Sequence, residues 1–192
     1  MKAKTYIPIL FILLVLFQVY VPASIVFNQE RIYFAGATYK MQLAPIDPND
    51  PFRGKYIILS FRENITKLPE DSKLEEGKTV YVVMKPGKND FLAIDSIASE
   101  FKSVKAPAVC IKASIGSISE TSNGYKEAHI DYPFTRFYVE ESKASEAEQR
   151  YLKAANDTNS LSYGLLSVYN ENVLVNDVII NGESLLSGIR KK

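Results

Sequence analysis

An apolar stretch near the N-terminus constrains the fold of this chain more than any other feature. From Ile7 to Phe27 the sequence is apolar apart from Gln18, Tyr20 and Ser24, and it includes two prolines. As a helix, these 21 residues would span roughly 30 Å, the thickness of the hydrocarbon core of a bilayer. The sequence therefore predicts a transmembrane helix from Ile7 to Phe27 that contacts membrane lipid, and a separate domain after it.

The charges on either side of the apolar stretch predict its orientation. Lys2 and Lys4 precede it, whereas Glu30 and Arg31 follow. Because positive residues tend to stay in the cytoplasm, this order favours a cytoplasmic N-terminus and an exported C-terminal domain. We therefore expect a single-pass protein of the cell membrane whose domain is extracytoplasmic, in the periplasm.

A cleaved signal peptide is the alternative reading of the same stretch. Val21-Pro22-Ala23 places small residues before Ser24, as a signal peptidase requires. The apolar sequence continues past this point to Phe27, which favours a retained anchor. We divide the chain into residues 1–27, the anchor or signal peptide, and residues 28–192, an extracytoplasmic β-rich domain.

The composition of the remaining chain excludes some classes of function. About 160 residues suffice for one domain with its own core. Lys and Arg number 23 against 22 Asp and Glu, and no basic run stands out, so we expect no nucleic-acid partner. The single cysteine, Cys110, lies in a strand-like run and is interpreted as a buried hydrophobic residue.

Strand patterns dominate the sequence after the apolar stretch. Runs rich in β-branched and aromatic residues are separated by turn signals, among them Asn123-Gly124 and Asn181-Gly182. One short helix is expected from Ser145, which forms a capping box with Glu148. We predict a mainly β fold: an antiparallel curled sheet, sandwich or half-open barrel with one short helix. The strand-like runs begin at residues 31, 54, 78, 90, 108, 125 and 134, with a last meander from residue 161.

The segment "IDPNDPFRGKYIILSF" is the most individual part of the chain. Asp47 and Asp50 each precede a proline, and Arg53 precedes Gly54. Asp before Pro starts a turn, and glycine permits backbone angles that other residues resist, so Pro48 and Gly54 are interpreted as structural turn residues. Arg53 can pair with either aspartate. The alternative is a ligand or partner site that uses the same charges.

This segment resembles the GDYXXLXY family of membrane-anchored bacterial proteins. The matching residues are Asp47, Pro48, Asp50, Arg53, Gly54, Tyr56 and Leu59. Lys55 replaces the family's aspartate and Phe61 its final tyrosine, so no role of that aspartate is carried over. No activity is established for the family.

Two further stretches carry the same resemblance. "RFYVEESKASEAE" is similar to a family pattern that falls here on Arg136, Val139, Glu141 and Glu148, and "VLVNDVIINGESL" is similar to its last hairpin. The candidate ligand-binding or partner-binding residues are Asp47, Asp50, Arg53, Tyr56, Arg136 and Glu141.

Catalytic and metal-binding patterns are weak in this sequence. His129 is the only histidine, and strand alternation places it on one polar face with Glu127 and Asp131. A zinc site would lack a second histidine and a cysteine pair, and Pro51 stands where a calcium loop needs a ligand. We expect no metal, no cofactor and no catalytic site, although a serine and lysine dyad stays open.

The sequence and the resemblance together predict an accessory or protein-interaction subunit of the bacterial cell envelope. The resemblance implies a polytopic membrane protein as the partner. The alternatives are a module that binds a small ligand or a glycan, and an envelope hydrolase.

Overall fold

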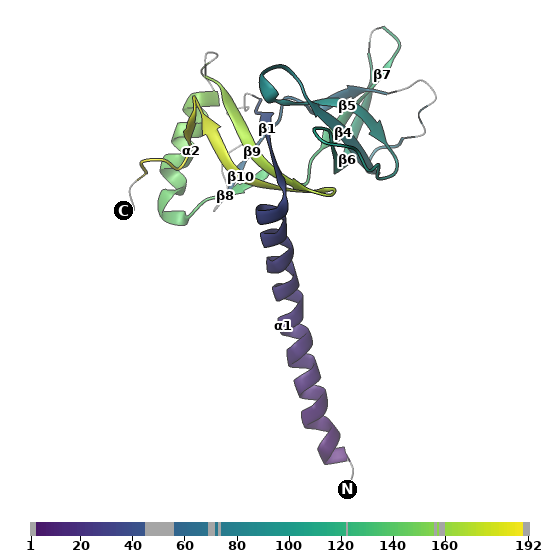
Figure 1. The fold of residues 1–192 in the computed structure, drawn as a ribbon, viewed down its shortest axis with the longest axis vertical. Coiled ribbons are helices and arrows are strands. Elements are labelled where there is room, and N and C mark those ends of the chain that lie inside the picture. Colours follow the sequence, from purple (N-terminus) through teal and green to yellow (C-terminus); the bar gives the residue numbers. More distant parts are fainter. Residues whose placement is uncertain are drawn as a thin grey trace.

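The computed structural model describes residues 3–44, 56–68, 72, 74–121, 123–155, 157 and 160–189. A long N-terminal helix carries a β-rich domain of two lobes (Figure 1). The predicted fold class is confirmed: the domain is built from antiparallel strands and one shorter α-helix. The predicted division of the chain at residue 27 stays a prediction.

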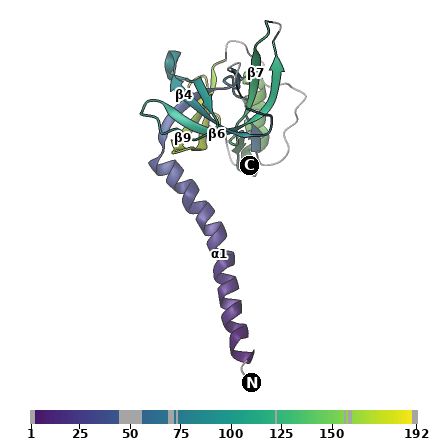
Figure 2. The ribbon, with the colours of Figure 1, turned by 90° about the vertical axis from the view of Figure 1, so that its right-hand side faces the viewer.

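The N-terminal helix α1 (Ala3–Ala35) projects from the domain (Figures 1 and 2). Most of its described side chains are exposed. The segment Pro8–Ala35 is long and apolar enough to cross a membrane, with a mean hydropathy of 2.5 over its most apolar window. A signal sequence has the same properties. The helix ends at Gly36, whose N–H donates to the carbonyl oxygen of Ile32 at 3.0 Å.

Helix α1 continues further than the sequence patterns indicate. The strand expected to begin at Arg31 begins instead at Ala37, because residues 31–35 extend the helix. Gly36 is the only residue between the two elements. The helix therefore enters the first strand without a linker.

The first lobe contains a four-stranded antiparallel sheet in the order β1-β9-β10-β11. Asn170 and Asn181 adopt positive φ angles of 54° and 51° in the turns that close the two hairpins of this sheet. The last predicted meander is therefore present. The strands are β1 (Ala37–Gln42), β9 (Ser162–Tyr169), β10 (Asn172–Ile180) and β11 (Glu183–Ser184).

The second lobe is a five-stranded antiparallel sheet in the order β3-β7-β6-β4-β5. In the expected hairpin at Asn123-Gly124, only Gly124 has a positive φ angle, 83°, so the turn is not of type I′. Instead, the Gly124 N–H donates to the Thr121 carbonyl and so closes a four-residue turn. The elements are β3 (Ile65–Lys67), β4 (Thr79–Pro86), the short 3₁₀ helix η1 (Lys88–Asp90), β5 (Leu92–Ala98), β6 (Val109–Glu120) and β7 (Lys126–Asp131).

A two-stranded sheet joins the first lobe into a curled, nearly closed structure. Strand β2 (Tyr56–Ile58) pairs with β8 (Arg136–Tyr138). The chain after β2 then bonds to the end of β1, through an isolated bridge between Leu43 and Phe61. This single bridge connects the four-stranded sheet to the separate β2–β8 pair. Among the described residues β8 and β10 form no ladder, so the curl stays open between them.

Helix α2 (Glu141–Ala155) packs on the first lobe and begins earlier than predicted. The expected capping box at Ser145 is wrong, because the helix already includes the four residues before it. A glutamate in the first turn suits the positive end of the helix dipole. Ala147 and Tyr151 lie on the buried face, as their spacing predicts.

The hydrophobic core runs through both lobes. Phe61 is one of its large buried side chains, with 2 % of its surface exposed, and its ring contacts Tyr132 and Phe134 at centroid distances of 6.0 and 5.4 Å. Cys110 is buried, as expected. The largest fully buried side chains include Met41, Leu59, Met84, Leu92, Ile111, Ile115, Ile130, Leu166 and Leu185.

Candidate functional site

Most of the segment "IDPNDPFRGKYIILSF", which carries the family resemblance, lies outside the described residues. The predictions that concern Asp47, Pro48, Asp50, Arg53 and Gly54, and the departure at Lys55, therefore stay predictions. Tyr56, Arg136 and Glu141 are described, and they define the part of the candidate site that can be built.

The β2–β8 pair brings Tyr56 and Arg136 together although 80 positions separate them in the sequence. Tyr56 lies directly opposite Tyr138, and their ring centroids are 5.8 Å apart. Arg136 lies diagonally across the pair, with its guanidinium carbon 5.2 Å from the centre of the Tyr56 ring. This is the geometry of a cation–π contact, which is worth about 0.5–1 kcal/mol at an exposed site.

A cavity of about 710 Å³ opens beside this cluster, at the gap between β8 and β10. We call it the β8–β10 cavity. Its walls are residues 132–138 and 173–176, and Gln29 of helix α1 completes the lining. The cavity therefore lies where the curled sheet stays open and next to the end of the N-terminal helix (Figure 1).

One wall of the cavity contains a β-bulge at Asn176. The register of β10 against β9 shifts between Val175 and Asp177, which leaves Asn176 as the extra residue. Its side-chain amide donates to the Ser167 hydroxyl at 2.7 Å. Its side-chain oxygen is buried, without a hydrogen-bond partner among the residues that the structure describes.

Glu141 occupies a different position from the other two described candidates. It lies in the first turn of α2, where its charge stabilises the positive end of the helix. The structure thus brings Tyr56 and Arg136 together, and it gives Glu141 a helix-stabilising position.

Sequence reasoning missed Tyr138, Gln29 and Asn176. The alternation in "RFYV" could have placed Arg136 and Tyr138 on one face of a strand. No sequence signal could have placed Gln29 or Asn176 at the same cavity, because their proximity depends on how α1 and β10 pack.

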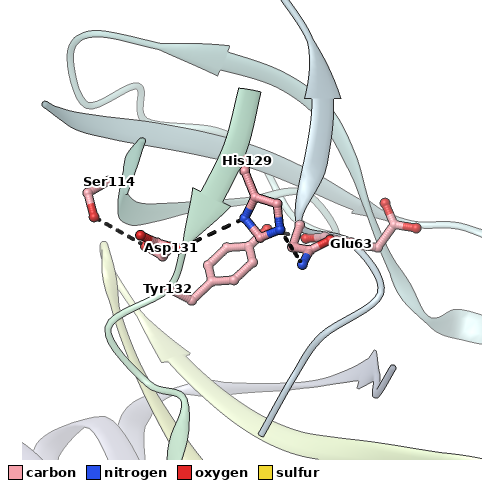
Figure 3. Close-up of polar contacts among 6 residues, drawn as sticks. Glu63, Ser114, His129, Asp131 and Tyr132 are labelled. Atoms are coloured by element: carbon pink, nitrogen blue, oxygen red, sulfur yellow. Dashed lines mark hydrogen bonds and ion pairs between the residues drawn. The ribbon is translucent and has the colours of Figure 1, made fainter. Parts of the chain in front are cut away.

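A second polar cluster surrounds His129 on β7 (Figure 3). The Nδ1 atom of His129 is 3.9 Å from the Asp131 carboxylate, and its Nε2 atom is 3.2 Å from the Asn64 side-chain nitrogen. If that nitrogen donates, the imidazole proton is on Nδ1 and faces Asp131. The expected strand face is thus present, and a cavity of about 220 Å³ adjoins it.

This cluster lacks the partners that nucleophilic catalysis needs. Ser114 donates to the backbone carbonyl of Asp131 at 3.5 Å and not to the imidazole. Nearby Tyr132 donates to the Glu63 carbonyl at 2.5 Å; burial, with a smaller contribution from the Glu63 charge, raises the pKa of Tyr132. That tyrosine therefore holds its proton at neutral pH and serves as a hydrogen-bond donor.

Metal-binding geometry is absent from the described part of the chain. No group of three or more His, Cys, Asp or Glu side chains there could hold an ion. A third cavity, of about 380 Å³, lies between α2 and the β10–β11 hairpin. Its Arg150 is already bound, to the Ser187 carbonyl at 2.5 Å and to Glu146 at 2.8 Å.

These features define a class of protein: a candidate membrane span that passes directly into an antiparallel, curled β domain. A family model described as GDYXXLXY protein matches residues 18–187, nearly the whole chain. The chain belongs to the GDYXXLXY family, as the resemblance indicates. The family has no established function, and its match brings no enzymatic signature. No curated protein and no solved structure matches the chain.

Proposed function

We propose that this protein is a membrane-anchored accessory subunit, whose extracytoplasmic domain is held at the membrane surface to bind an integral membrane partner. The direct passage of α1 into β1 through Gly36 is the observation that supports this function best. A flexible linker would let a domain work far from the membrane. A linker of one residue instead fixes its height and orientation, which a subunit that meets a membrane-embedded partner needs.

Contacts around the junction support the same proposal. Arg31, in the last turns of α1, lies with its guanidinium carbon 5.6 Å from the centre of the Tyr169 ring on β9. Helix α1 also packs against β9 and β10. Such contacts brace the domain against the helix.

The exposure of α1 supports a partner within the bilayer. No residue of its most apolar window is buried by the described domain. Lipid can cover such a surface, and so can the helices of a polytopic protein. Binding rather than catalysis is the proposed activity, because the described clusters hold no nucleophile activated by a base.

Co-purification from native membranes tests this proposal. We expect the full chain, crosslinked in the cell before extraction, to carry an integral membrane protein with it. A matched control replaces residues 7–27 by an unrelated apolar span of equal length, which keeps the domain in place but removes the contacts of α1. The absence of any integral membrane protein from the wild-type complex would contradict the proposal.

The size of the β8–β10 cavity favours a second candidate function, binding of a small ligand. A volume of about 710 Å³ lies in the range of ligand pockets. A glycan-binding module and an envelope hydrolase remain predictions that no observation on this structure favours.

A further inference from the structure

We propose that the β8–β10 cavity, which Arg136 helps to line, binds phospholipid headgroups of the membrane that α1 crosses. The inference rests on the proposed membrane anchorage of α1. It adds a lipid-binding site on the domain itself to the anchorage by the helix.

The position of the cavity along α1 indicates its depth in the membrane. The apolar run ends at Phe27, and four polar residues follow, Asn28 to Arg31. Four helical residues rise about 6 Å, which equals the thickness of one headgroup layer, roughly 5–8 Å. Gln29, the second of the four, lines the cavity. The cavity therefore lies at headgroup depth when the apolar run fills the hydrocarbon core.

The position of the domain on α1 agrees with this depth. Helix α1 contacts β10, and its Gln29 lines the same cavity as residues 132–138. The β6–β7 hairpin points away from the helix (Figures 1 and 2). The helix itself continues for six residues past Gln29, to Ala35. The face with the cavity thus reaches back along the helix toward the membrane.

The chemistry of the rim matches a phosphate group. The Arg136 side chain is exposed, and among the described residues no carboxylate forms an ion pair with it. Stacking on Tyr56 orients the guanidinium and leaves its N–H groups available. A guanidinium can bind phosphate through two parallel hydrogen bonds, which makes arginine the preferred residue for this recognition.

Exposed aromatic rings on β8 and on α1 support lipid as the source of the phosphate. Tyr138, beside Arg136, exposes 67 % of its surface, and Tyr33 on α1 exposes 53 %. Tyrosine concentrates at membrane interfaces because its ring is apolar and its hydroxyl polar. A soluble phosphate compound would not require such rings, so lipid headgroups are the better match.

The test uses full-length protein in vesicles of phosphatidylethanolamine and phosphatidylglycerol, a small part of the lipid carrying a nitroxide quencher on its headgroup. Because the chain contains no tryptophan, Tyr138→Trp introduces a single fluorescent reporter. Tyr125→Trp, at the distal β6–β7 hairpin, is the matched control. We expect quenching of the Tyr138→Trp reporter to be about twice that of the control or more. Equal quenching would overturn the proposal.

A second set of variants tests Arg136 in the Tyr138→Trp background. Arg136→Gln should reduce the quenching toward the level of the distal control, Arg136→Lys should retain part of it, and Lys126→Gln at the distal hairpin should change nothing. Unchanged quenching in Arg136→Gln would overturn the assignment of this residue to headgroups. Retention of the chain in the vesicles after an alkaline wash, measured in parallel, separates this failure from failure of the anchor.

Discussion

At the scale of single residues, aromatic packing explains one departure from the family signature. Phe61 replaces the family's tyrosine, and it lies in the core against Tyr132 and Phe134. Gly164 lies beside the ring, since a Cβ atom there would be 3.3 Å from it. The site is apolar, so a side chain without a hydroxyl leaves no polar group to satisfy.

Truncation of Phe61 should therefore be costly. We expect Phe61→Ala to lower the free energy of unfolding by about 3–5 kcal/mol, because it leaves a cavity among rings that cannot close it. Phe101→Ala is the control, since Phe101 exposes 45 % of its surface. Urea unfolding of the full chain in detergent, followed by near-ultraviolet circular dichroism, measures both. Equal losses would contradict the role of the buried Phe61 ring in the core.

At the scale of elements, the strands and their hairpin partners were predictable, whereas the long-range partners were not. The runs at β4, β5, β6 and β7 show the alternation that marks half-buried strands, and turn residues separate them. The pairing of β2 with β8 depends on residues 80 positions apart, for which a single sequence carries no signal. Tyr56 and Arg136 were therefore both predicted as site residues, but their contact was not.

Two errors at element ends have local causes. Arg31 to Ala35 contain aromatic and β-branched residues that suit a strand, yet the helix before them continues because its hydrogen-bonded turns are already formed. Ser145 and Glu148 fit a capping box, but Glu141 already lies within the first turn of α2. Several local sequence signals compete at the end of a helix or strand. A sequence pattern alone does not show which signal determines the end.

A side chain at Gly36 should destabilise the junction between α1 and β1. A Cβ atom there would collide with the carbonyl oxygen of Ile32 and lie 3.1 Å from the Cβ of Ser167. We expect Gly36→Ala to destabilise the domain by roughly 1–3 kcal/mol and to increase hydrogen exchange in β1. Gly87→Ala is the control, because its nearest contacts would be at 3.6 Å. Equal exchange in β1 for both variants would contradict a tight junction.

At the scale of the whole molecule, the position of the domain and of its cavity depends on the proposed anchor, helix α1. In the proposed arrangement helix α1 sets the depth of the chain in the membrane. Strand β1 follows directly after Gly36, and the curled sheet opens between β8 and β10. A helix long and apolar enough to span a membrane and the β-rich class were predictable from composition and periodicity. The place of the cavity beside α1 was not, because it follows from packing of the helix on β9 and β10.

The central claim is that α1 stays in the membrane and holds the domain on its outer face. The most direct measurement fuses alkaline phosphatase to Lys192, which is active only after export, and follows the fusion through an alkaline wash of the membranes. The account predicts an active, full-length fusion that remains in the membrane pellet. An inactive fusion would contradict export, and an active but soluble fusion that begins near Ser24 would contradict the anchor.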